Sequence, residues 1–384
     1  MPLLGDPITY WIIRVSLIAL LLVCGYNISY KDKDGTRFWR WSIPAWIAYS
    51  LIEGLRYMRG QDYYHYMGDL QGDLFTEYRD MLYVWWLDFF HATGLHFAVG
   101  FVFYSAILFY AFLLIVKKFP QTAVWALPLF LIIIPETENL VRQFLATSFI
   151  IIGISNYLDG KKICRVVISF VAAYMTHFSA LFAIAVFLIL VFLKKYRKSS
   201  AGLPIIPLAI FSLLYFFWDT SYFYFLTSYL DSLHIDDNTL GASYLDNAER
   251  WFSEEGSIAL VLGNSAHSVS VVLQNISFLT NAAIVWFGYI AMKNDNRLYI
   301  LYWFSYLAIL LATIGGDIEM YNRFRQWLVY FTPIMYGAIF AYCPLNNGVK
   351  YSLIGLFTLR WFIYGTLYQF GQMGYSGCAF IWDM

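Results

Sequence analysis

The sequence has little charge, few cysteines and none of the motifs that mark several common enzyme classes. Charged residues make up 13% of the 384 residues, whereas hydrophobic residues make up 60%. A soluble domain of average composition contains about 25% charged residues, because its surface must be solvated. The composition therefore excludes a water-soluble globular protein and predicts a chain that lies largely in lipid.

Neither a disulfide framework nor a metal site is predicted. The four cysteines (Cys24, Cys164, Cys343 and Cys378) and the six histidines are scattered along the chain. There is no GxxxxGK[ST], HExxH or GxSxG segment, so nucleotide hydrolysis, zinc proteolysis and serine-type acyl transfer have no support. We expect a protein that uses no metal and no other cofactor.

Long apolar runs recur throughout the chain and predict an all-α polytopic integral membrane protein. A bilayer span needs about 20 mostly apolar residues, and we expect about twelve spans. A re-entrant or interfacial helix is expected at 81–97, where the run is aromatic but too polar for lipid. The main polar outer loops are expected at about 58–97, 219–266 and 315–326, and residues 1–384 are predicted to form a single transmembrane domain.

The apolar run at 163–193 is too long for one span. Thr176-His177-Phe178-Ser179 lies at its middle. We therefore expect a tight hairpin of two spans, whose outer tip carries His177.

Lysine and arginine are distributed differently. All lysines fall at 31–33, 117–118, 161–162, 194–198, 293 and 350, in short connections that the positive-inside rule assigns to the cytoplasm. Both termini and all six histidines then fall outside, where arginine is the remaining cation. The guanidinium group can bind phosphate or carboxylate through two parallel hydrogen bonds, so these arginines suggest an anionic ligand. Snorkelling at a helix end explains Arg14 instead.

Four polar clusters stand out on the predicted outer side. They are Arg56, Arg59, Asp62 and His65 in the first loop, Arg142-Gln143 at a helix start, His177 at the hairpin tip, and Asp317, Glu319, Arg323 and Arg325 in a late loop. An ionised side chain at bilayer depth costs about 2.5–3.5 kcal/mol on insertion scales, so such residues need a partner or a function.

Each cluster also has a purely structural interpretation. Arg56 can pair with Glu53 three residues earlier. Asp62 either neutralises Arg59 or orients an incoming hydroxyl group. For His177, a hydrogen-bonded buried histidine is as good an interpretation as a catalytic one.

These segments resemble the EpsG family of bacterial exopolysaccharide and O-antigen polymerases, which are Wzy-like. The resemblance rests on four segments, in this order along the chain: LRYMRGQDYYHYM, NLVRQFLA, YMTHFSALF and YNRFRQW. Their order and spacing fit over nearly the whole chain.

The resemblance implies a glycosyltransferase in the bacterial inner membrane, whose active site faces the periplasm or exterior. Such enzymes build O-antigen, capsule or exopolysaccharide. They transfer a glycan from undecaprenyl diphosphate onto the next lipid-linked repeat unit. The implied partners are the lipid-linked donor and acceptor, the bilayer and, by family analogy alone, a chain-length regulator and a flippase. Nucleic acid is not among them.

This chemistry suggests roles for the clusters. Arginines would bind the pyrophosphate and stabilise the charge that develops as the glycosidic bond breaks, with Arg142, Arg323 and Arg59 as the first candidates. A base would take the proton of the acceptor hydroxyl, and His177 and Asp62 are both candidates. The remaining members of the predicted binding set are Arg56, His65, Gln143, Arg325 and Asp317.

Three other functions stay open. A membrane O-acyltransferase that modifies exported glycans would use a catalytic histidine, for which His177 is available. A flippase or transporter of lipid-linked glycan would carry polar residues along a path through both faces, whereas the inward half here is apolar apart from its lysines. An O-antigen ligase uses the same donor, and only the motif resemblance separates it from a polymerase.

Overall fold

The computed structural model describes residues 5–32, 35–60, 62–72, 80–196, 203–219, 267–315, 319–362 and 378–384. Helices make up these ranges almost entirely, and no strand occurs among them. The predicted all-α class is confirmed.

Five helices in the described ranges are long and apolar enough to cross a membrane. They are α1 with the turn that continues it (Pro7–Lys31), α5 (Phe97–Val116), α8 (Val141–Leu158), the Gln274–Asn294 part of α16 (His267–Asn294), and α17 (Tyr299–Gly315) with the turn before it. Shorter apolar helices include α9 (Ile163–Thr176) and α11 (Ile205–Phe217). The chain is therefore a membrane protein, and the total of about twelve spans stays a prediction.

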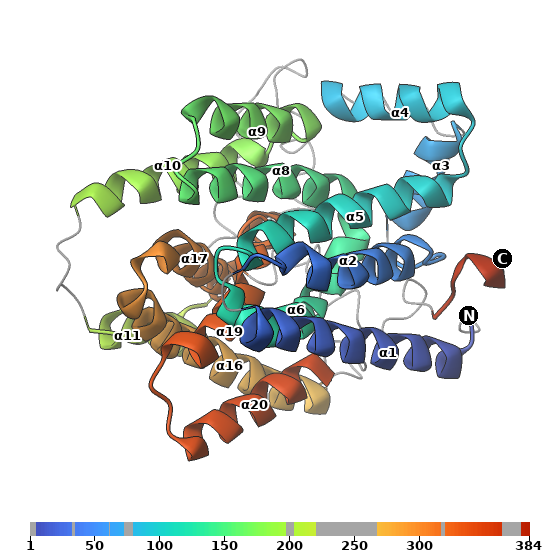
Figure 1. Cartoon of the computed structure of the whole chain (residues 1–384). Coiled ribbons are helices and arrows are strands. Elements are labelled where there is room, and N and C mark those ends of the chain that lie inside the picture. Colours follow the sequence, from blue (N-terminus) through green and yellow to red (C-terminus); the bar gives the residue numbers. More distant parts are fainter. Residues whose placement is uncertain are drawn as a thin grey trace.

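The helices form two packed groups. In the first, α2 (Phe38–Gly54) packs against α1 and α5, and α5 packs against α8 (Figure 1). The second group contains α11, α16, α17, α19 (Thr332–Tyr342) and α20 (Asn347–Phe362). Helix α6 (Ala123–Leu129) joins the groups, because it packs against both α1 and α19.

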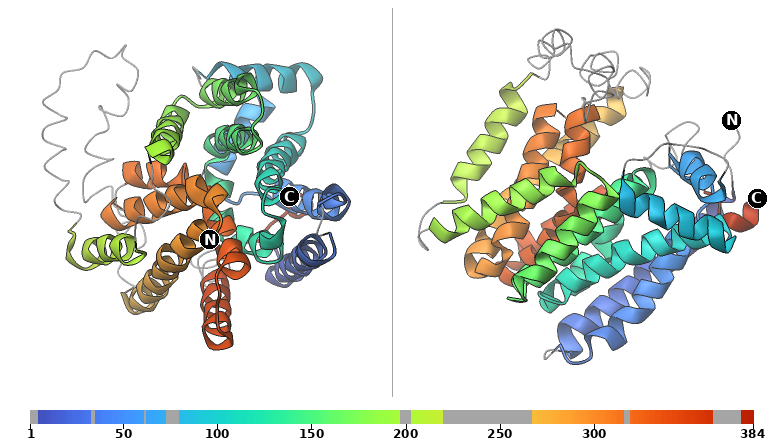
Figure 2. Two further views of the ribbon diagram at one scale, coloured as in Figure 1. Left: turned by 60° about the vertical axis from the view of Figure 1, so that its left-hand side comes forward. Right: turned by 90° about the horizontal axis from the view of Figure 1, so that it is seen from above.

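The lysine-bearing ends of several helices lie together. Lys118 forms an ion pair with Asp159 that joins the end of α5 to the end of α8. The Arg297 guanidinium lies 5.3 Å from the ring centroid of Phe119, which brings the start of α17 to the same place. Arg142 and Gln143 stand at the opposite end of α8, and the segment with Arg56 and Asp62 contacts residues 138 and 139 just before that end. Near them, the backbone of Gly5 lies against that of Ala379, so the two ends of the described chain lie side by side (Figure 1 and Figure 2).

The hairpin predicted at 163–193 is confirmed. Helix α9 ends at Thr176, and α10 (Ala180–Tyr196) begins after a short turn that contains His177. The two helices pack against each other and against α8.

Two segments predicted as outer loops contain helices. Residues 63–71 form α3 (Tyr63–Gln71), and residues 319–326 form α18 (Glu319–Gln326). Both segments are polar but contain no proline and few β-branched residues, so their polarity does not prevent a helix. The helix predicted at 81–97 is present as α4 (Met81–Thr93), which Gly94 ends with a φ of +61°. The loop predicted at 219–266 lies outside the described residues, apart from Asp219.

Proline stands at the start of two helices, a position that it favours. Helix α19 begins at Thr332, with Pro333 in its first turn. Residues 134–139 form a short helix, α7 (Ile134–Asn139), with Pro135 at its start.

Candidate functional site

All four polar clusters contribute to one cavity of about 190 Å³. Its lining residues are Asp62, His65, Tyr66, Leu140, Arg142, Gln143, His177 and Arg323. All except Tyr66 and Leu140 were singled out from the sequence. The structure therefore brings together side chains that are separated by more than a hundred residues along the chain.

The start of α3 supplies one wall. Asp62 precedes the helix without capping it through its side chain, and its backbone N–H donates to Oδ1 of Asn139 at 3.1 Å. One turn later, the His65 Nε2 lies 3.9 Å from a carboxylate oxygen of Asp69. Tyr66 is buried, and burial raises its pKa to about 12. Its phenol therefore stays protonated and is a potential hydrogen-bond donor at the cavity.

The start of α8 supplies a second wall. Nη1 of Arg142 lies 3.1 Å from Oδ2 of Asp80, and the guanidinium lies 5.6 Å from the ring centroid of Tyr83. Oδ1 of Asp80 accepts a hydrogen bond from the backbone N–H of Phe178 at 3.0 Å. Asp80 thus connects the arginine to the turn that carries His177. Sequence reasoning missed Asp80, whose only signal was its position immediately before the apolar run of α4.

His177 lies in the turn between α9 and α10 and is 8% exposed. Its ring stands edge-on to Trp327, with ring centroids 5.5 Å apart. Burial, reinforced by Arg142 and Arg323, lowers its pKa from 6.5 to about 3. The imidazole is therefore neutral at neutral pH. Its Nδ1 accepts a hydrogen bond from the backbone N–H of Ser179 at 3.3 Å, which assigns the proton to Nε2.

Helix α18 contributes Arg323 to the lining. Nε2 of Gln143 donates to the backbone oxygen of Arg323 at 3.0 Å, and this bond ties α8 to α18. Arg325 is not among the lining residues, and its Nε donates to Oδ1 of Asn322 at 2.8 Å. Asp317 lies outside the described residues.

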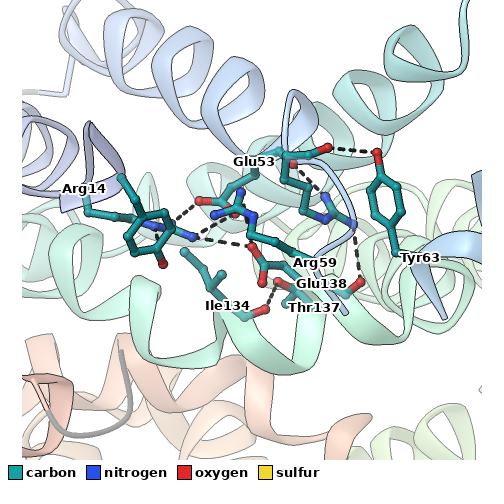
Figure 3. A network of polar contacts seen from close by, with 9 residues as sticks. Arg14, Glu53, Arg59, Tyr63, Ile134, Thr137 and Glu138 are labelled. Carbon is teal, nitrogen blue, oxygen red and sulfur yellow. Dashed lines mark hydrogen bonds and ion pairs between the residues drawn. The ribbon is translucent and has the colours of Figure 1, made fainter. Parts of the chain in front are cut away.

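Arg56 and Arg59 are not among the lining residues of the cavity either. Arg59 lies in a buried polar network that also contains Arg14 (Figure 3), and Arg56 joins this network through the backbone oxygens of Glu53 and Glu138. The expectation that Arg14 snorkels is wrong, because it is 5% exposed and forms ion pairs with Glu53 and Glu138. Arg56 contacts Glu53 through the backbone, with Nη1 donating to its carbonyl oxygen at 2.6 Å.

Comparison with known proteins identifies the family. Residues 39–377 match the model of the EpsG family. The chain belongs to the EpsG family. The resemblance inferred from the four sequence segments is thereby confirmed. Neither the comparison with curated proteins nor the comparison with solved structures gave a match.

The cavity of this EpsG family member combines anion-binding and proton-accepting groups. Two arginines, the neutral imidazole of His177, the imidazole of His65, a phenol and a carboxylate line the same space. Such a set can hold an anionic leaving group at one wall and accept a proton at the other. Within the described ranges, no group of three His, Cys, Asp or Glu side chains is arranged to hold a metal ion.

Proposed function

We propose that this protein is a polysaccharide polymerase of the bacterial inner membrane, acting at its outer leaflet. It transfers the growing glycan from undecaprenyl diphosphate onto the next lipid-linked repeat unit. The observation that carries the proposal is the cavity in which Arg142 and Arg323 share the lining with Asp62 and His177.

The two arginines suit the leaving group of this reaction. When the bond between the sugar and the diphosphate breaks, negative charge develops on the phosphate oxygens. Guanidinium groups bind such oxygens in pairs and stabilise the charge. Asp80 and Tyr83 hold the guanidinium of Arg142 at the lining, so little ordering is left to be done when the substrate binds.

Asp62 is the better base. A histidine base needs a lone pair directed at the substrate, and the Nδ1 lone pair of His177 is occupied by the Ser179 N–H. We infer that Nε2–H of His177 donates to a substrate oxygen and that Asp62 accepts the proton of the acceptor hydroxyl. The new bond joins this hydroxyl oxygen to the sugar carbon, and the lipid diphosphate leaves as an anion.

The hydrogen bond from the Ser179 N–H to Nδ1 of His177 also makes an acyltransferase a less suitable assignment, because that reaction would use His177 as the base. The placement of the lysines supports an outward-facing cavity. The lysine-bearing ends, which the positive-inside rule assigns to the cytoplasm, lie at the ends of α5 and α8 opposite to it.

The test is genetic. The gene is deleted in its host, complemented with wild type or Arg142→Ala, and the glycans are separated by size. The proposal expects Arg142→Ala to lose long chains while single repeat units remain. Arg297→Ala, at the lysine-bearing end, is the matched control and should restore full length.

Each other outcome has a meaning. Unchanged chain length with Arg142→Ala contradicts the proposal. Loss of acetyl groups alone indicates an acyltransferase. Long chains that accumulate on the lipid carrier without transfer to a final acceptor indicate a ligase.

A further inference from the structure

Four buried charged side chains form an alternating ring, here called the ionic ring: Arg14, Glu53, Arg59 and Glu138 (Figure 3). Each arginine contacts both glutamates. Nη2 of Arg59 lies 3.5 Å from Oε1 of Glu138 and 3.9 Å from Oε2 of Glu53. Arg14 is ion-paired with Glu53, and its Nη2 lies 3.4 Å from Oε1 of Glu138.

The ring joins four parts of the chain that are distant in sequence. Arg14 belongs to α1, Glu53 to α2, Arg59 to the connection before α3, and Glu138 to α7. All four residues are less than a tenth exposed. Removal of one member leaves an uncompensated buried charge, so the four segments are held together strongly.

One side of the ring holds two backbone segments against each other. Nη2 of Arg56 donates to the backbone oxygen of Glu138 at 3.3 Å. A Cβ on Gly60, whose φ is +98°, would lie 2.7 Å from the same oxygen, so the close approach requires glycine. The next contact is the hydrogen bond from the Asp62 N–H to Asn139. Residues 56, 60 and 62 therefore all lie against residues 138–139.

These two segments lead directly into the two walls of the cavity. Asp62 ends the first segment, and α8 with Arg142 begins two residues after Asn139. We propose that Glu138 and Arg59 are positioning residues, whose ion pair sets the place of Asp62 relative to Arg142. This inference rests on the proposed polymerase function.

A further segment holds Arg59 in the ring. Its guanidinium contacts two aromatic rings, 4.9 Å from the centroid of Phe380 and 5.4 Å from that of Tyr10. Phe380 is held in turn by an isolated antiparallel bridge to Arg56, with the Tyr57 N–H donating to the oxygen of Ala379 at 3.0 Å. The segment that carries Phe380 therefore helps to hold Arg59 in the ionic ring.

The test uses purified protein in detergent and measures glycan transfer per folded molecule from a lipid-linked repeat unit. Arg59→Gln and Glu138→Gln should each lower kcat by about 10²-fold with KM little changed, because displaced reacting groups cost about that much. Arg59→Lys keeps the charge and should recover part of the loss. Arg14→Gln is the matched control. It breaks the same ring but belongs to neither wall, so it should lower the melting temperature and leave kcat per folded molecule unchanged.

Asn139→Ala provides an independent variant that leaves the ring intact. It removes the oxygen that accepts the Asp62 N–H and should lower kcat without lowering the melting temperature. This variant decides the question if the ring variants do not fold.

Two results would overturn the inference. One is an equal loss of kcat per folded molecule in Arg14→Gln and Glu138→Gln, which would mean that the ring serves stability alone. The other is wild-type kcat in Asn139→Ala. Arg142→Ala separates this failure from failure of the proposed function. If Arg142→Ala is inactive while Glu138→Gln is fully active, only the positioning role is wrong. If Arg142→Ala still extends chains, the proposed function and the inference fall together.

Discussion

Replacement of Asp80 tests the organisation of the cavity most directly. Its carboxylate makes one contact to Arg142, at 3.1 Å, and one to the N–H of Phe178, at 3.0 Å. The side chains of Arg142 and Asp80 are only 21% and 12% exposed, so water replaces these contacts poorly. Asp80→Ala removes both contacts, whereas Asp80→Asn keeps an oxygen that accepts from Phe178.

The magnitude follows from these two contacts. A hydrogen bond to a charged group contributes about 1.5–3 kcal/mol to stability. Because both are lost but some water enters, we expect Asp80→Ala to lower the free energy of unfolding by about 3 kcal/mol, near the low end of their sum. Asp80→Asn should cost about half of that. Arg142 also becomes misplaced, and turnover should fall by about 10²-fold.

The assay combines unfolding in detergent with glycan transfer from a lipid-linked repeat unit. Asp88→Ala is the matched control, since Asp88 lies on the same helix but is exposed. The reasoning is refuted if Asp80→Ala and Asp88→Ala have the same stability and the same turnover. Equal stability with lower turnover for Asp80→Ala would limit the role of Asp80 to orienting Arg142.

Three further predictions follow from the same site. In the unfolded chain His177 has the ordinary histidine pKa of 6.5, whereas in the folded protein its pKa is about 3. The free energy of unfolding should therefore fall by about 1.4 kcal/mol per pH unit as the pH drops from 6.5 towards 3. Melting curves from neutral to acidic pH should show that His177→Asn removes this slope. Arg142→Lys and Arg323→Lys should each shorten the glycan, because lysine cannot make the paired contacts of a guanidinium, and full-length glycan from both would contradict the assignment of the pyrophosphate contacts. Gly60→Ala should lower both the melting temperature and turnover, because the added Cβ would lie 2.7 Å from the Glu138 oxygen; wild-type values would show that the two segments can separate without consequence.

Short-range and compositional features could be predicted well. The apolar runs indicate a membrane protein, and the polar interruption at 176–179 indicates the hairpin. Polar helices were harder to recognise, because α3 and α18 lack a long apolar stripe and look like loops. The EpsG family was recognisable because its four segments keep their order along the chain.

The sequence by itself determined the all-α membrane class, the family and the candidate polar clusters. Only the tertiary structure divided the arginines between two places. Arg142 and Arg323 line the cavity, while Arg14, Arg56 and Arg59 lie in the buried network. The physical reason is the range of the contacts. A pattern along the chain reveals partners three or four residues apart. Arg14 instead contacts glutamates that are 39 and 124 residues away, and these contacts depend on how α1, α2 and α7 pack.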